Sequence, residues 1–160
     1  MIIFAFCVFL GTFVGYKLSS KYKKRYLLYK ECQEFFHFYK LQIGFSREKI
    51  KDIVNKFISS KDRVIFPYEQ YVLFLNNTSA YASYSLDGLD FLKKDEIDFL
   101  KAQYLSIGKY SVSEEMQNID KILNEINVLT TQTNEQFKKY SSLYLKLGLI
   151  VGAAVGLIFL

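Results

Sequence analysis

Residues that build catalytic and metal-binding sites are scarce in this sequence. The 160 residues include one histidine, His37, two cysteines, Cys7 and Cys32, and no tryptophan. So few histidines and cysteines exclude the four-ligand sets that bind structural zinc, and no glycine-rich phosphate-binding motif is present. His37 lies between two phenylalanines, where we expect it in the core or at its boundary. We therefore expect a protein that is not an enzyme and binds neither a cofactor nor a metal.

Features that would break helices or form strands are also rare. Pro67 is the only proline, and no segment alternates apolar and polar residues over a sustained length. Such alternation marks a half-buried strand, whereas apolar residues three and four apart indicate an amphipathic helix. The sequence therefore predicts an all-α fold.

Charged side chains are absent from both ends of the sequence. Residues 1–16 and 147–160 contain none of the 21 basic and 16 acidic side chains. A membrane-spanning helix needs about 20 apolar residues, and the second run reaches back to Leu143 if Lys146 extends its amine toward the headgroups. Buried helices of a soluble protein are the alternative. We interpret residues 1–16 as an N-terminal transmembrane anchor, 17–142 as a cytoplasmic helical bundle and 143–160 as a C-terminal transmembrane helix.

Positive charges follow the first apolar run, whereas those of a cleaved signal peptide precede it. We therefore expect the first run to be an anchor that is not cleaved. Residues 1–30 hold six Lys/Arg and no acid, and residues 31–160 hold fifteen Lys/Arg and sixteen acids. By the positive-inside rule, this basic flank places the middle of the chain in the cytoplasm and both termini outside the cell membrane. It favours anionic lipid, not nucleic acid, as a partner. The basic flank comprises Lys17, Lys21, Lys23, Lys24, Arg25, Lys138, Lys139 and Lys146.

The middle of the chain shows apolar residues at helical spacing. A first helix is expected to end at Gly44, because glycine is common just after a helix, and Ser46 is expected to cap the next helix. Further along we expect a helix over 66–75 and a polar loop, with at most a short helix, over 76–88. The expected buried stripe of the first helix is Leu28, Cys32, Phe35, Tyr39 and Ile43, and that of the second is Ile50, Ile53, Val54 and Phe57.

The helical signal is strongest in the last third of the sequence. A helix from residue 95 is expected to stop at Gly108, and Ser111 with Glu114 matches the S-x-x-E capping box that starts a helix. Apolar residues three and four apart then continue into the C-terminal run, which predicts one helix over 112–160. Threonines at 130 and 133 interrupt this seam, so looser packing or a partner's side chain is expected there. The seam comprises Met116, Ile119, Leu123, Ile126, Thr130, Thr133, Phe137, Tyr140, Tyr144 and Leu147.

Glycines recur four residues apart in both apolar ends. Gly11 and Gly15 lie in the first end, and Gly148, Gly152 and Gly156 lie in the second. Within a bilayer, small residues let helix backbones approach closely. We therefore predict that these faces pack on each other or on a neighbouring subunit. The plainer explanation is that glycine is simply frequent in membrane helices.

The order of these features resembles that of the stage III sporulation protein AB family of endospore-forming bacteria, in which two spans flank a cytoplasmic helical domain. The segment "QIGFSREKI" resembles the family's helix–turn–helix, and "LKKDEIDFLKAQYLSIGKYSVSEEMQNI" resembles its Leu-Gly turn and long helix. The closing "KYSSLYLKLGLIVGAAVGLIFL" resembles the family's C-terminal span. The family's tryptophan is missing, with Tyr81 or Tyr84 as a stand-in, and the other departures are Gln42, Lys49, Ser111 and Glu115.

The resemblance implies a small antiparallel helix bundle like the cytoplasmic domain of F-type proteins of type II secretion platforms. It also implies a non-enzymatic component of the channel complex between mother cell and forespore, located in the mother-cell membrane. Its partners would be other subunits of that channel, a secretion-type ATPase and further copies of the chain. The alternatives are a membrane-surface amphipathic helical protein that acts on lipids or as a generic adaptor, and an enzyme regulator or a membrane-tethered enzyme.

Overall fold

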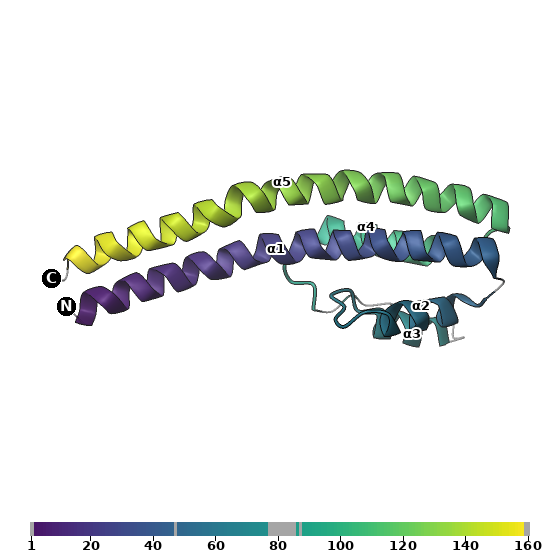
Figure 1. Ribbon diagram of the computed structural model, residues 1–160, viewed down its shortest axis with the longest axis horizontal. Coiled ribbons are helices and arrows are strands. Elements are labelled where there is room, and N and C mark those ends of the chain that lie inside the picture. Colours follow the sequence, from purple (N-terminus) through teal and green to yellow (C-terminus); the bar gives the residue numbers. More distant parts are fainter. Residues whose placement is uncertain (1, 47, 77–85, 87, 159–160) are drawn as a thin grey trace. The chain divides into compact units, whose positions relative to one another are not determined.

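The computed structural model describes residues 2–46, 48–76, 86 and 88–158, and these form five helices and no strand. The predicted all-α fold is therefore confirmed for this part of the chain. Most of the loop predicted over 76–88, including Tyr81 and Tyr84, lies outside the described residues. The helices are α1 (Ile2–Phe45), α2 (Ile50–Ser59), α3 (Tyr68–Asn76), α4 (Lys94–Ser106) and α5 (Val112–Ile158) (Figure 1).

The chain forms two compact units. Unit 1 consists of Met1–Leu27 and Thr131–Leu160, and unit 2 consists of Leu28–Thr130. Both α1 and α5 contribute residues to both units. The boundaries predicted at 16/17 and 142/143 followed the charges, whereas the two units divide the chain by its packing. Unit 1 therefore contains the basic flank as well as the apolar ends.

Unit 1 is an antiparallel pair made by the first half of α1 and the last half of α5 (Figure 1). One polar contact in this unit joins the hydroxyls of Ser19 and Ser141, whose oxygens are 2.8 Å apart. Farther from the glycines, the ring of Tyr22 lies 5.2 Å from that of Tyr140. Thr133 is also buried in this unit. The prediction of looser packing is therefore wrong for this side chain.

Unit 2 encloses an aromatic core. Tyr104 of α4 is fully buried, and its ring stacks on that of Phe66 with centroids 4.0 Å apart. The ring of Phe35, on α1, lies 5.2 Å from that of Tyr104 and 5.3 Å from that of Phe57 on α2. The predicted stripes are confirmed: Leu28, Cys32, Phe35, Tyr39, Ile53, Val54 and Phe57 are buried, and Ile43 and Ile50 pack against them half-buried.

The predicted cap at Ser46 is wrong. The backbone N–H and the hydroxyl of Ser46 both donate to the carbonyl of Gln42, 2.8 and 3.0 Å away, so Ser46 completes the last turn of α1. The residue that precedes α2 is Lys49, whose side chain makes no capping bond. Gly44 stands one residue before the end of α1 and has no positive φ. The end of α1 was therefore predicted to within one residue, but Gly44 does not end the helix in a left-handed conformation.

The other two predicted termini agree better with the structure. Gly108 follows α4 with a φ of +78°, as expected for a glycine that ends a helix. At the start of α5, the carboxylate of Glu114 accepts bonds from the Ser111 N–H (3.2 Å) and hydroxyl (2.7 Å). These bonds lower the pKa of Glu114. The predicted long last helix is confirmed as α5, over 47 residues.

Gly108 should tolerate substitution much less well than Gly88, the other glycine with a positive φ. A Cβ at Gly108 would collide with Cδ1 of Ile50, whereas a Cβ at Gly88 would meet nothing within 4 Å. Both Gly→Ala variants bear the left-handed backbone cost of about 1–2 kcal/mol, and only Gly108→Ala adds the overlap. We expect urea unfolding to show the larger loss of stability for Gly108→Ala. Equal losses would mean that Ile50 moves aside freely.

Candidate membrane helix pair

The glycines of α1 lie directly against those of α5. A Cβ added to Gly11 would be 2.8 Å from the Cα of Gly152 and closer still to the carbonyl oxygen of Gly148. Added to Gly152, it would be 2.8 Å from the carbonyl oxygen of Cys7. These neighbours are backbone atoms, which cannot rotate away as a flexible side chain can. The close approach of the two helices therefore requires glycine at these positions.

The contact extends along both apolar ends. A Cβ on Gly15 would lie 2.5 Å from the carbonyl oxygen of Tyr144, and one on Gly156 would lie 2.7 Å from the ring of Phe4. All five predicted packing glycines thus face the other helix of the same chain. The sequence left open whether these faces meet each other or a neighbouring subunit, and in this structure they meet each other.

Large apolar side chains cover the outside of the pair. Within the described residues, α5 is the one helix long and apolar enough to cross a membrane. Of its most apolar stretch of 18 residues, 11% is buried. An exposed apolar surface of this kind marks a membrane or protein contact. The exposed apolar side chains of unit 1 include Phe6, Phe9, Phe13, Val14, Leu149, Ile150, Val151 and Leu157.

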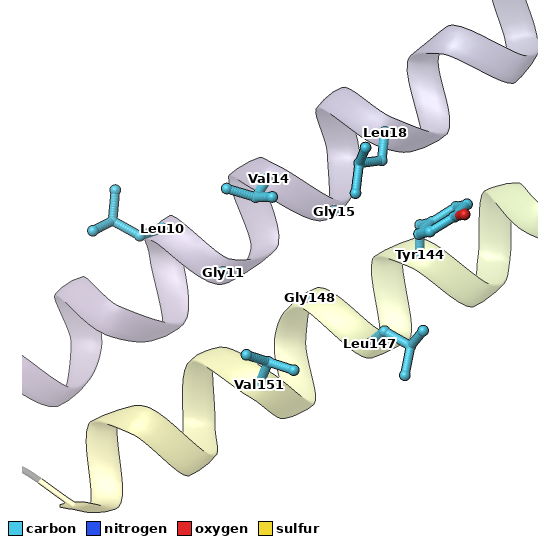
Figure 2. A pocket seen from close by; sticks show the side chains of 9 residues that line it. All are labelled: Leu10, Gly11, Val14, Gly15, Leu18, Tyr144, Leu147, Gly148 and Val151. Atoms are coloured by element: carbon cyan, nitrogen blue, oxygen red, sulfur yellow. The ribbon is translucent and has the colours of Figure 1, made fainter.

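A groove of about 350 Å³ lies between α1 and α5 in unit 1. Figure 2 shows Gly11, Gly15 and Gly148 where the two helices face each other, with branched apolar side chains around them. Tyr144 is the lining residue with a polar side-chain atom. The remaining lining residues are Leu10, Val14, Leu18, Leu147 and Val151.

The predicted basic flank falls entirely within unit 1. Arg25 donates to the side-chain oxygen of Gln136 at 2.6 Å, which links α1 to α5. The amine of Lys17 lies 5.7 Å from the ring centroid of Phe13, and that of Lys139 lies 5.5 Å from that of Tyr140. Lysine and tyrosine side chains next to the end of an apolar helix are residue types found at membrane–water boundaries.

Unit 2 contains a buried carboxylate that the sequence analysis did not single out. Glu31 accepts hydrogen bonds from the backbone N–H groups of Ile65 (2.7 Å) and Phe66 (3.0 Å). The bonds attach the segment between α2 and α3 to α1. Burial raises the pKa of Glu31, although the two backbone donors and nearby Lys61 oppose this effect. The sequence signal that could have identified Glu31 is its place directly before Cys32, in the part of α1 predicted to be buried.

Two further glutamates bond groups outside their own helices. Glu96 is buried and accepts the hydroxyl of Tyr29 at 2.8 Å, as well as the N–H of Lys93 at 3.0 Å. Glu115 is buried and accepts the N–H of Gly108 at 2.7 Å and the hydroxyl of Tyr39 at 3.3 Å. Glu115 therefore joins α5 to the preceding turn and to α1.

The raised pKa of Glu31 makes part of the stability of unit 2 depend on pH. A carboxyl with a raised native pKa stabilises the fold most when it is protonated, so its contribution is lost as the pH rises through that pKa. We expect the stability advantage of the wild type over Glu31→Gln, taken as the difference in their free energies of unfolding, to fall as the pH rises from about pH 4, near the ordinary value for glutamate, to neutral pH. Urea titrations at several pH values measure this slope. The exposed Glu69→Gln is the control, and a slope unchanged by Glu31→Gln would contradict the assignment.

Two groups of unit 2 whose pKa is raised are enclosed by the core. Burial raises the pKa of the Cys32 thiol and of the Tyr104 hydroxyl, so both stay protonated, and a buried thiol is unreactive. His37, expected in the core or at its boundary, is exposed instead. Among the described residues, no three His, Cys, Asp or Glu side chains form a group that could hold a metal ion.

Comparison with known proteins gives no relative for this chain. It matches no protein-family model, no curated protein and no solved structure.

Proposed function

We propose that the protein is a non-enzymatic membrane scaffold in which α1 and α5 cross a bilayer together and unit 2 lies on the cytoplasmic side. The observation that carries this proposal is the glycine contact between the two helices. The backbone of Gly148 and Gly152 fills the space beside Gly11, and the backbone of Cys7 and Val8 fills the space beside Gly152. Large apolar side chains such as Phe9 and Ile150 remain on the outside. In lipid, small residues at the helix contact and apolar residues outside are the expected distribution.

The orientation rests on charge. Unit 1 holds eight Lys/Arg and a single acid, Glu135, and the positive-inside rule assigns such a flank to the cytoplasm. Unit 2 follows the flank in α1 and precedes it in α5, so it lies in the cytoplasm as well. Both ends of the chain are then outside.

The membrane assignment can be tested on the full chain in bacterial membranes. We expect the protein to stay in the pellet after alkaline carbonate washing, and release without detergent would reject the proposal. Sidedness requires an exposed reporter, since Cys32 is buried. In a Cys7→Ser background, Ser113→Cys on the exposed start of α5 should react with an impermeant maleimide only after the cells are opened. Labelling in intact cells would reverse the orientation.

The biological role proposed for this scaffold comes from the resemblance to the stage III sporulation protein AB family. In that role, unit 2 would dock other subunits of the channel between mother cell and forespore, including a secretion-type ATPase. Co-purification of the ATPase with the full-length protein from detergent-solubilised membranes tests the role directly. No capture, together with strong remodelling of liposomes by the protein, would favour the alternative of a protein that acts on lipids.

A further inference from the structure

The groove of unit 1 cannot stay empty inside a bilayer. Atoms that line a void lose their dispersion contacts, and ordered water needs two to four polar partners, whereas Tyr144 is the one lining residue with a polar side-chain atom. Its walls are Leu10, Val14, Leu18, Leu147 and Val151, with glycine backbone between them. Within the membrane, the groove is therefore filled either by a hydrocarbon chain or by side chains of another helix.

The glycine contacts favour the hydrocarbon chain. A third transmembrane helix approaches closely where small residues offer it a flat surface. Here Gly11 and Gly15 already face the backbone at Gly148, Gly152 and Tyr144, so the small-residue surface is used within the chain. What remains is an open apolar groove between branched side chains, which a flexible single chain can fill without the small-residue surface that a helix needs.

Charge at one end of the groove favours an anionic headgroup. Lys21 lies three residues after Leu18 and seven after Val14, so it is on the same face of α1 as these two lining residues. Lys21 is exposed, and within the described part of the chain it makes no ion pair. Unit 1 contains eight Lys/Arg and one acid. The positive charge of Lys21 therefore stays uncompensated at the end of the groove that lies toward the membrane–water boundary.

We infer that the groove binds one acyl chain of an anionic phospholipid of the cytoplasmic leaflet, whose headgroup pairs with Lys21. This inference rests on the proposed function, because it requires unit 1 to lie in the membrane. The bound lipid completes the surface of the helix pair and ties it to membranes rich in anionic lipid.

Tryptophan fluorescence tests this site cleanly, because the chain has no tryptophan of its own. Leu147→Trp and Val151→Trp each place one reporter on the groove lining, and Leu149→Trp places one at a similarly exposed position that does not line the groove. The full-length variants are reconstituted in phosphatidylcholine vesicles with increasing fractions of phosphatidylglycerol or phosphatidylcholine that carry brominated acyl chains. Bromine quenches the reporter when its chain is adjacent.

We expect half-maximal quenching of the groove reporters at about five-fold less brominated phosphatidylglycerol than brominated phosphatidylcholine, the enrichment that one lysine near anionic lipid supplies. Lys21→Gln should remove this preference, and Leu149→Trp should show little of it. Equal quenching of the groove reporters by the two lipids would overturn the inference.

Two other outcomes separate the possible causes of failure. If Leu149→Trp is quenched but both groove reporters are shielded from either lipid, a protein helix covers the groove, and the lipid site is rejected while the membrane assignment stands. If no reporter is quenched, the helix pair is not embedded, and the proposed function fails together with the inference.

Discussion

Gly152→Leu should abolish the close pairing of α1 and α5, whereas Leu149→Ala should leave it intact. The Cβ alone would be 2.8 Å from the carbonyl oxygen of Cys7 and 2.9 Å from the Cα of Val8, and leucine adds three more carbons. Overpacking of this kind typically costs about 1–3 kcal/mol, and here the obstructing atoms are backbone. Leu149 is 52% exposed, so we expect its truncation to disturb the contact between the helices far less.

A disulfide between the two helices measures this pairing in the membrane. The hydroxyl oxygens of Ser19 and Ser141 are 2.8 Å apart, so the double variant Ser19→Cys/Ser141→Cys should cross-link within one chain on mild oxidation. We expect Gly152→Leu to lower the yield by about ten-fold or more, which corresponds to about 1.4 kcal/mol. Similar yields for Gly152→Leu and Leu149→Ala would show that the glycine contact does not govern the pairing.

Tyr104→Ala should be the most destabilising single change in unit 2. The side chain is fully buried and its ring contacts aromatic rings from several elements, including Phe66 with centroids 4.0 Å apart. It also bonds the hydroxyl of Tyr68 at 3.2 Å. Removing a large buried aromatic side chain costs about 3–5 kcal/mol, a large share of the stability of a typical domain.

Urea unfolding of the full chain in detergent, followed by circular dichroism, provides the measurement. Tyr104→Phe retains the ring and loses only the hydroxyl, so we expect about 0.5–1.5 kcal/mol for it. Tyr110→Ala, at a side chain that is 53% exposed, should change the stability by no more than about 0.5 kcal/mol. A Tyr104→Ala variant as stable as Tyr110→Ala would mean that the aromatic core can collapse around the space left behind.

Helices and their buried faces could be predicted from the sequence because they depend on local spacing. Leu28, Cys32, Phe35 and Tyr39 recur at three- and four-residue intervals, and all four are buried. The same spacing predicted α5 as one continuous helix. Turns were less predictable: Ser46 stands where a capping residue would, yet its hydroxyl donates to the preceding helix. A short polar side chain can bond in either direction along the chain, and the sequence does not say which neighbour it will take.

The sequence alone determined that this protein is helical, that its ends are apolar and uncharged, and that glycine recurs in both ends every fourth residue. The tertiary structure decided which surfaces meet: Gly11 with Gly148 and Gly152, and Glu31 with the backbone of Ile65 and Phe66. The physical reason is that helical periodicity is fixed by residues within a few positions of each other. Close backbone contacts and the partners of buried carboxylates join residues far apart in the chain, and only the packed fold specifies them.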